Sequence, residues 1–363
     1  MLGARALTPI GLDIGRHAIK AVQCVGSPRS PRVVASLTLP RTAATPGLAL
    51  DEAARLGDVL WRHGFQGRAA VVGVPESMLL ASTIEIPPPS AGAPLAQIAA
   101  SELARLHGVD QEGLETDFWV LPPTGPKGQR HEAIVVGVRS AEVQTLLEPL
   151  QSADGTGLTV RAVDVGPCAR ARASLLARPA DAAYGVLDLG WTASRLSVIH
   201  EGQLVYDRTL PDAGLAHLER RLEQECALRP DDIQAVLRAG SDGPARRISG
   251  SWAAAVATHA TACATEVAES LRYLALHRGV DRPRTVLLTG GGGECVPFVA
   301  SLTEELAGAT PLSLAAGFPG RSRTESDGAS DPPRSSLAGA LGLSLWGSNA
   351  AARSGSNSAR RAA

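Results

Sequence analysis

The sequence predicts an α/β protein made of two related halves, and two observations carry that prediction. Strands and helices alternate along most of the 363 residues. The motif GLDIGRHAIKAV at residues 11–22 also returns as VLDLGWTASRLSV at residues 186–198. Each copy reads as a strand, an aspartate, a glycine turn and a second strand, which makes it an internal repeat. We expect a duplicated architecture of this kind to bind its ligand in a cleft between the halves.

The composition fits two folded domains with aliphatic cores. Hydrophobic residues make up 44% of the chain and aromatic residues only 3%. The formal net charge of -1 provides no basic field for nucleic acid or for an acidic membrane surface. The five cysteines are odd in number and form no C-x-x-C pair, which favours a reduced cytoplasmic chain over a disulfide or zinc framework. We expect neither a membrane-spanning helix nor a signal peptide.

The hydrophobic periodicity of the first half predicts a three-strand opening followed by alternating helices and strands. The expected strands are Ile10–Ile14, Ala18–Cys24, Val33–Leu39, Ala69–Val74, Leu79–Ile86, Asp117–Leu121, Ala133–Val138 and Leu158–Val165. The expected helices are Asp51–His63, Pro94–Leu106, Ala141–Ser152 and Gly166–Ala177. Turns are expected at Pro28–Pro31 and Thr124–Arg130, where proline and glycine cluster.

The second half repeats the opening pattern and is richer in helix. The expected strands are Gly185–Leu189, Ser194–His200, Gln203–Leu210 and Thr285–Thr289. The expected helices are Ala213–Ala227, Pro230–Ala239, Trp252–Arg278, Val296–Ala307 and Ser336–Trp346. The polar segment Pro319–Ser335 and the tail from Gly347 are expected to be mobile or disordered.

The first hairpin has the residues that a phosphate site needs. Strand alternation sends Leu12 and Ile14 into the core and Asp13 to the other face. Gly15 can adopt a positive φ, so that backbone N–H groups converge on an anion. A phosphate beside Asp13 requires a cation between them, and Mg²⁺ held through waters meets that need. Lys20, one of only two lysines, follows on the returning strand as a compact positive charge.

Two further segments strengthen this interpretation over an ordinary surface hairpin. Asp188 and Gly190 repeat the aspartate and glycine turn, and Thr192 and Ser194 add hydroxyls, so a ligand could be held from both sides. The strand ending at Thr289 leads into four glycines, Gly290–Gly293. A backbone without side chains at that point would let a base or ribose pack closely.

Together these residues resemble the superfamily that contains actin and the sugar kinases. GLDIGRHAIK resembles its first phosphate motif, LDLGWTAS the second and VLLTGGGG the adenosine motif, while SLAGALGLSL resembles its last crossing helix. Within the superfamily, the chain resembles the type IV pilus assembly PilM family. The stretches that carry this likeness are VVGVPESMLLASTIEIP, AIVVGVRSAEVQTLLEPLQSA, GLTVRAVDVGPCARARA, LSVIHEGQLVYDRTL and TEVAESLRYL.

The resemblance implies an actin-like fold, that is, a duplicated ribonuclease H-like α/β fold of two domains with a small inserted α+β subdomain of the FtsA/PilM type. The implied parts are 1–78 and 155–182 for subdomain 1A, 79–154 for the inserted subdomain 1C, 183–210 and 258–318 for subdomain 2A, and 211–257 for subdomain 2B. The remaining parts are a mobile loop at 319–335, a closing helix of 1A at 336–346 and a disordered tail at 347–363.

The resemblance also implies ATP with Mg²⁺ as the ligand. The implied nucleotide-binding residues are Asp13, Gly15, Arg16, His17, Lys20, Asp188, Gly190, Trp191, Thr192, Gly290, Gly291 and Gly292. Asp13 and Asp188 would hold the metal, and Asp164 is the candidate for polarising the attacking water. Glu266, on the long helix, is placed either at the ribose or facing solvent.

Three departures from the family pattern affect the expected chemistry. Arg16 and His17 stand in the first turn, where small or hydroxyl residues are usual, and Trp191 stands in the second, where alanine or serine is usual. Gly166 stands where relatives tend to have an acid. The chain is therefore expected to bind nucleotide and to be at most a slow ATPase.

The implied role is that of a cytoplasmic adaptor at the inner face of the inner membrane, in a type IV pilus or related secretion machine. Its implied partner is the N-terminal peptide of a PilN-like inner-membrane protein, with the pilus motor ATPase and self-association as further interactions. Two alternatives of the same fold are a small-molecule kinase and an FtsA-like filament protein. A kinase would need a catalytic aspartate, for which only Asp164 is suitably placed. The tail SNAARSGSNSARRAA lacks the apolar stripe of a membrane-binding FtsA-like helix.

Overall fold

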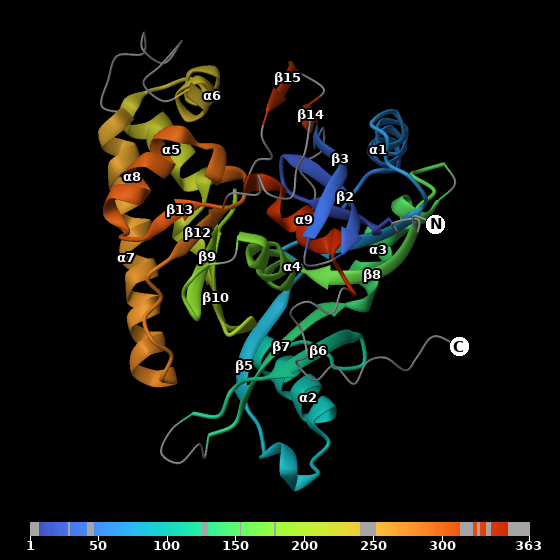
Figure 1. Ribbon diagram of the computed structural model, residues 1–363, viewed down its shortest axis with the longest axis vertical. Helices are drawn as coiled ribbons and strands as arrows, with labels where there is room; N and C mark the ends of the chain where they lie inside the picture. The colour runs from blue at the N-terminus through green and yellow to red at the C-terminus, as the bar shows by residue number, and fades with distance from the viewer. Residues whose placement is uncertain are drawn as a thin grey trace. The chain divides into compact units, whose positions relative to one another are not determined.

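The computed structural model forms two compact units (Figure 1). The first contains residues 1–173, 317–332 and 339–363, and the second contains residues 174–316 and 333–338. The structure describes residues 7–27, 30–41, 47–124, 130–152, 154–177, 179–239, 252–312, 322–324, 327–331 and 335–347.

The first unit is built on a five-stranded mixed sheet. Its strands are β1 (Ile10–Ile14), β2 (Ala18–Ser27), β3 (Ser30–Pro40), β4 (Ala69–Val74) and β8 (Thr159–Val165). Their order is β3-β2-β1-β4-β8. The strands β1, β4 and β8 run parallel, whereas β2 pairs antiparallel with both β1 and β3. The carboxyl ends of β1, β4 and β8 therefore lie along the same edge of the sheet.

Helices cover both faces of this sheet. On one face, α1 (Leu50–Arg62) and α3 (Ser140–Gln151) bury Leu56, Leu60, Leu146 and Leu150 against Leu12 and Val72. On the other face, Ala169 of α4 (Gly166–Ser174) and Leu343 of α9 (Ala338–Ser344) pack against Val71. The alternation of Val71 and Val72 between the two cores is the strand periodicity that the sequence predicted.

The inserted segment forms its own small sheet within the first unit. Its elements are β5 (Leu80–Glu85), the 3-10 turn η1 (Pro89–Ala91), α2 (Leu95–His107), β6 (Leu114–Val120) and β7 (Glu132–Arg139). The strand order is β5-β7-β6, and Ile84, Leu103 and Val135 lie in its core. Thr124 and Arg130 bridge between β6 and β7, and residues 125–129 of that predicted turn lie outside the described residues. Helix α3 falls within the implied bounds 79–154 of the inserted subdomain, and its leucines pack in the core of the large sheet.

The second unit repeats the large sheet. Its strands are β9 (Ala183–Asp188), β10 (Ser194–His200), β11 (Gln203–Leu210), β12 (Val286–Thr289) and β13 (Ala309–Pro311), in the order β11-β10-β9-β12-β13. Strands β9, β12 and β13 run parallel, and β10 pairs antiparallel with both β9 and β11. This order matches the first sheet strand for strand, which confirms the duplicated actin-like fold. Strand β13 was not predicted from the sequence, because it has only three residues and ends in a proline.

Four helices complete the second unit, with short 3-10 turns η4 (Pro211–Ala213), η6 (Gly291–Glu294) and η8 (Ser335–Leu337) between elements. They are α5 (Leu215–Cys226), α6 (Pro230–Ala239), α7 (Trp252–Arg278) and α8 (Val296–Glu305). Helix α7 packs against α5 and α8, and Figure 1 shows these helices grouped together.

Several boundaries differ from those that the sequence predicted. The helix expected over Gly166–Ala177 ends in a separate 3-10 turn, η3 (Leu175–Ala177), and the closing helix is shortened at its start by η8. Within the predicted loop 319–335, β14 (Ser322–Thr324) pairs antiparallel with β15 (Asp327–Asp331). Residues 28–29 of the first predicted turn, 319–321, 325–326 and 332–334 of the loop, and 348–363 of the tail lie outside the described residues. Among the helices that the structure describes, none is long and apolar enough to cross a membrane.

The closing helix α9 packs against its neighbours through glycine. A Cβ added to Gly11 of β1 would lie 2.1 Å from the carbonyl oxygen of Ala340, and one added to Gly342 would lie 1.7 Å from that of Ala169 in α4. Both distances are far inside van der Waals contact, so only glycine permits this approach of backbone to backbone. The small residues of SLAGALGLSL are therefore a packing requirement.

We predict that Gly342→Ala destabilises the protein by roughly 2–4 kcal/mol, because the added methyl group forces α9 away from α4. Urea denaturation of both proteins would measure the change. Gly113→Ala is the matched control, since no atom lies within 4 Å of its added Cβ. Equal stability losses in the two variants would contradict the packing argument.

The core of the second unit holds a neutral histidine. His259 of α7 is 4% exposed, and its ring centroid lies 5.3 Å from that of Phe298 in α8. Its Nε2 has no hydrogen-bond partner among the described residues. Burial, followed by the charges of Arg221 and His217, lowers the pKa of His259 to about 4.

We predict that His259 makes the protein acid-sensitive. Because its pKa is lower in the folded state than the ordinary 6.5, the unfolded chain takes up the proton first as the pH falls. The contribution of neutral His259 to the free energy of unfolding is complete above pH 6.5 and is lost progressively down to about pH 4. About 2 kcal/mol of it is lost at pH 5. Denaturation of wild type and His259→Leu near pH 7 and pH 5 tests this, and the variant should lose less. An equal loss in both would show that other groups cause the acid sensitivity.

Candidate functional site

The first candidate site is the hairpin that joins β1 to β2. Asp13 stands directly opposite Lys20 in the antiparallel register, and the N–H of Gly15 donates to the carbonyl of Ala18 at 3.0 Å to close the turn. Asp13, Gly15 and Lys20 are half-buried, whereas Arg16 and His17 are exposed at the tip. Partial burial, with a smaller effect of the Arg16 guanidinium, lowers the pKa of His17. The five residues expected from the sequence thus lie together in one turn.

The reason for glycine in this turn differs from the expected one. Gly15 is absent from the described glycines with positive φ. An added Cβ would lie 3.1 Å from the carbonyl oxygen of Ala18, and at the equivalent Gly190 the distance to the carbonyl oxygen of Ala193 would be 2.3 Å. Both glycines are therefore required by the tightness of the turn rather than by a left-handed backbone.

Helix α9 positions the carboxylate of this hairpin. A Cβ on Gly339 would lie 2.7 Å from Oδ2 of Asp13, so the carboxylate rests directly against the helix backbone. Any larger residue at 339 would displace it. The close packing of α9 thus continues to the aspartate itself.

A buried ion pair supports the hairpin on the side of α1. Arg41 and Glu52 form a salt bridge at 3.0 Å, with side chains only 2% and 1% exposed. Arg41 also donates from Nη1 to the carbonyl of Gly15 at 3.1 Å, and its backbone N–H donates to the carbonyl of His17 at 2.9 Å. Arg41 therefore ties both ends of the turn to α1, one through its guanidinium and the other through its backbone N–H. No motif identifies this residue in a chain so rich in arginine.

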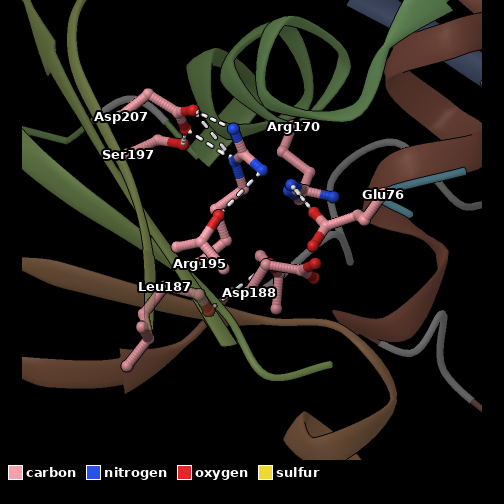
Figure 2. A network of polar contacts seen from close by, with 9 residues as sticks. Glu76, Arg170, Leu187, Asp188, Arg195, Ser197 and Asp207 are labelled. Atoms are coloured by element: carbon pink, nitrogen blue, oxygen red, sulfur yellow. Dashed lines mark hydrogen bonds and ion pairs between the residues drawn. The ribbon is translucent and has the colours of Figure 1, made fainter. Parts of the chain in front are cut away.

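The second candidate site is the equivalent hairpin between β9 and β10. Asp188 stands directly opposite Arg195, as Asp13 stands opposite Lys20. In both hairpins the cation follows the aspartate by seven residues, so aligning the two repeats would have identified Arg195. Figure 2 shows its guanidinium bound by Asp207 of the neighbouring strand, with Nε 3.0 Å from Oδ1 and 2.9 Å from Oδ2. Ser197 donates to the same carboxylate at 2.9 Å.

The second turn is held at the start of α5. The carbonyls of Gly190 and Trp191 accept from the N–H groups of Leu215 and Ala216 at 3.1 and 2.9 Å. The Ser194 hydroxyl is buried and donates to the carbonyl of Ala213 at 2.7 Å. Of the two expected hydroxyls, only that of Thr192 belongs to an exposed residue.

The glycine run after β12 packs against this second hairpin. Gly290 has a φ of 85°, and an added Cβ would lie 2.5 Å from Oδ1 of Asp188, an oxygen that also accepts from Thr289 at 3.3 Å. The N–H of Gly292 donates to the carbonyl of Leu189 at 2.8 Å. Two of the four glycines thus have a packing reason within the chain itself. Gly291 has no atom within 4 Å of its added Cβ, so its backbone is open to a ligand.

The two remaining expected residues lie on β8 and α7. The carboxylate of Asp164, at the end of β8, forms an ion pair with Arg172 and accepts the N–H of Val165 at 2.8 Å. Arg172 also donates to the carbonyl of Gly342 at 2.9 Å, so this pair ties β8, α4 and α9 together. Glu266 is half-buried on α7, where its backbone carbonyl accepts from the Ser270 hydroxyl at 2.8 Å. Its charge adds to burial in raising the pKa of Cys263 to about 12.

The carboxylates at the two hairpins suit a metal ion that is coordinated mainly by a bound phosphate ligand and by water. Among the described residues, no group of three histidine, cysteine or acidic side chains could hold a metal ion alone. Asp13 and Asp188 each offer one carboxylate beside a tight turn. That chemistry suits Mg²⁺, which keeps several waters and commonly takes one or two carboxylates together with phosphate oxygens.

We predict that Arg41 stabilises the first turn beyond its effect on global stability. Arg41→Met should cost roughly 3–5 kcal/mol, because Glu52 is left as an unpaired buried charge. Arg41→Met/Glu52→Met removes both charges and should recover most of that loss. The hydrogen bond from the guanidinium to the Gly15 carbonyl is still absent in this double variant. Hydrogen exchange of the turn amides should then be faster in the double variant than in wild type.

The surface pair Arg105 and Glu102, at 2.7 Å, provides the control for this experiment. Arg105→Met should leave both the stability of the protein and the hydrogen exchange of the turn nearly unaltered. Unchanged exchange in the double variant would mean that Arg41 contributes stability only.

Comparisons with known proteins agree on the fold. A structure described as a PilM-PilN type IV pilus biogenesis complex matches with a TM-score of 0.70 and 23% identity, over 95% of this chain and 99% of that chain. The ethanolamine utilization protein EutJ from Carboxydothermus hydrogenoformans matches with a TM-score of 0.53 and 15% identity, over 95% and 91% of the two chains. No curated protein sequence matches. The family described as type IV pilus assembly protein PilM matches residues 11–345, and the chain therefore belongs to that family.

Proposed function

We propose that this protein is a nucleotide-binding adaptor of a type IV pilus or related secretion machine. The observation that carries the nucleotide part is the repeated hairpin, in which an aspartate at a strand end faces a cation across the turn. Family membership over residues 11–345 supports the pilus part.

In this proposal, Mg²⁺-ATP is the ligand. Asp13 and Asp188 hold the metal through waters, and Lys20 neutralises phosphate charge. The further contacts come from Gly15, Arg16, His17, Gly190, Trp191 and Thr192 in the turns, from Gly290, Gly291 and Gly292, and from Glu266 at the ribose. Within the described ranges no ion pair engages the Lys20 ammonium, which favours its use on a ligand.

Turnover is proposed to be slow. Asp164 is the candidate base, but its carboxylate accepts from both Arg172 and the Val165 N–H. The carboxylate is thus already engaged within the chain, which argues against efficient activation of a water molecule. The same ion pair argues against the small-molecule kinase, which would need that aspartate at its substrate.

The proposed partner is the cytoplasmic N-terminal tail of a PilN-like inner-membrane protein. The matched pilus structure is described as a complex of PilM with PilN, and this chain aligns with nearly all of that chain. The adaptor would act at the inner face of the inner membrane. Contacts with the pilus motor ATPase and self-association are further parts of the proposal.

Calorimetric titration of wild type, Asp13→Asn and Asp58→Asn with ATP, with and without Mg²⁺, tests the nucleotide part. We predict that Asp13→Asn weakens Mg²⁺-dependent binding by at least tenfold, roughly the loss of one charge-assisted contact. Asp58→Asn changes an exposed carboxylate of α1 and should bind as wild type does. No binding to wild type at millimolar ATP would end the proposal, and equal affinity of Asp13→Asn would leave the hairpin with a structural role only.

The adaptor part is tested separately with a labelled tail peptide from the PilN-like protein encoded beside this one. Fluorescence anisotropy should show saturable binding, and a scrambled peptide should not bind. If nucleotide and tail are coupled, ATP changes the tail affinity and the tail changes the ATP affinity by the same factor. Absence of tail binding would contradict the adaptor role while leaving the nucleotide result intact.

A further inference from the structure

A second carboxylate lies at the same edge of the first sheet as Asp13. Glu76 follows the end of β4, the strand that stands between β1 and β8. Since these three strands run parallel, Asp13, Glu76 and Gly166 all stand where the strands end. The side chain of Glu76 is 37% exposed.

Arg170 of α4 holds this carboxylate. Its Nη2 lies 3.1 Å from Oε1 of Glu76, and its own side chain is only 8% exposed (Figure 2). The guanidinium folds back over the start of the helix, where a Cβ on Gly166 would lie 2.8 Å from Nη1. Glycine at 166 therefore makes room for a buried positive charge.

The closing helix α9 contacts both the Asp13 hairpin and α4. Gly339 of α9 rests on the Asp13 carboxylate, and Gly342 rests on the backbone of Ala169, the neighbour of Arg170. Three residues of helix separate these two contacts on α9, a rise of about 4.5 Å. The Asp13 hairpin and the helix that carries Arg170 therefore border the same short stretch of α9.

We propose that Arg170 recognises the terminal phosphate of a bound nucleoside triphosphate, and that Glu76 competes with that phosphate for the guanidinium. This inference rests on the nucleotide site proposed above and adds a specificity residue to it. A buried guanidinium needs an anionic partner, and phosphate matches its planar fork as well as a carboxylate does. Glu76 satisfies Arg170 when no third phosphate is present. A diphosphate ends short of this pair, so Arg170 distinguishes triphosphate from diphosphate.

The competition predicts opposite effects for the two partners. Arg170→Met should weaken binding of a non-hydrolysable ATP analogue by roughly tenfold or more, and should change ADP binding by less than about threefold. Glu76→Gln keeps the shape of the side chain but removes its charge, so it should tighten binding of the same analogue by roughly three- to tenfold. Arg170→Lys should keep part of the preference, and Arg105→Met serves as the surface control.

Titration calorimetry with the analogue and with ADP, both with Mg²⁺, measures these ratios without reference to turnover. The rise in unfolding temperature that each ligand causes provides a second readout. Glu76 is half-exposed, so Glu76→Gln should fold even where Arg170→Met does not. Equal changes for analogue and ADP in Arg170→Met, or unchanged or weaker analogue binding in Glu76→Gln, would overturn the inference while the nucleotide site stands. Failure of wild type to bind either nucleotide would overturn both.

Discussion

The direct packing of helix α9 on β1 is the constraint on which the rest of the first unit depends. Gly11 and Gly342 let backbone meet backbone, so that a side chain at either point would move the helix, and Gly339 leaves room for the Asp13 carboxylate. Because Asp13 and Ala169 both rest on this helix, α9 acts as a spacer that fixes the β1 hairpin relative to α4. A helix near the end of the chain thereby controls where the Asp13 carboxylate lies, near its start. This explains why a helix of only seven residues carries so many small residues.

The two hairpins have the same geometry but different electrostatics. Each places an aspartate opposite a cation seven residues later. In the first, the described residues leave Lys20 without an ion pair, while Arg41 holds the turn from the α1 side. In the second, Asp207 binds Arg195 with both oxygens, so that cation is already neutralised. A duplicated fold has therefore kept the scaffold twice, whereas the charge available for an anionic ligand is concentrated in the first copy.

The repeat, most strands and most helices could be predicted because they depend on periodicity, which a single sequence displays directly. Asp13, Lys20 and Asp188 could be found because the motif recurs. Arg195 could have been found by aligning the two copies of the repeat, because it stands where Lys20 stands in the first copy. Arg41, Glu52 and Glu76 could not be found, since their roles arise from contacts between segments that are distant in sequence and carry no motif. The reason for the glycines was also hidden: Gly15, Gly190, Gly290 and Gly292 are needed for close approach to other parts of the chain, which only the packed structure reveals.

The edge of the first sheet carries two carboxylates that are each held by a guanidinium, Asp164 by Arg172 and Glu76 by Arg170. The two pairs differ in exposure, because the side chain of Glu76 is 37% exposed and that of Asp164 is 13% exposed. In the proposed competition, a third phosphate replaces Glu76 and so changes the position of the Arg170 side chain on α4, which packs on α9. An adaptor that binds its nucleotide without rapid turnover would keep this state long enough to transmit it to a partner.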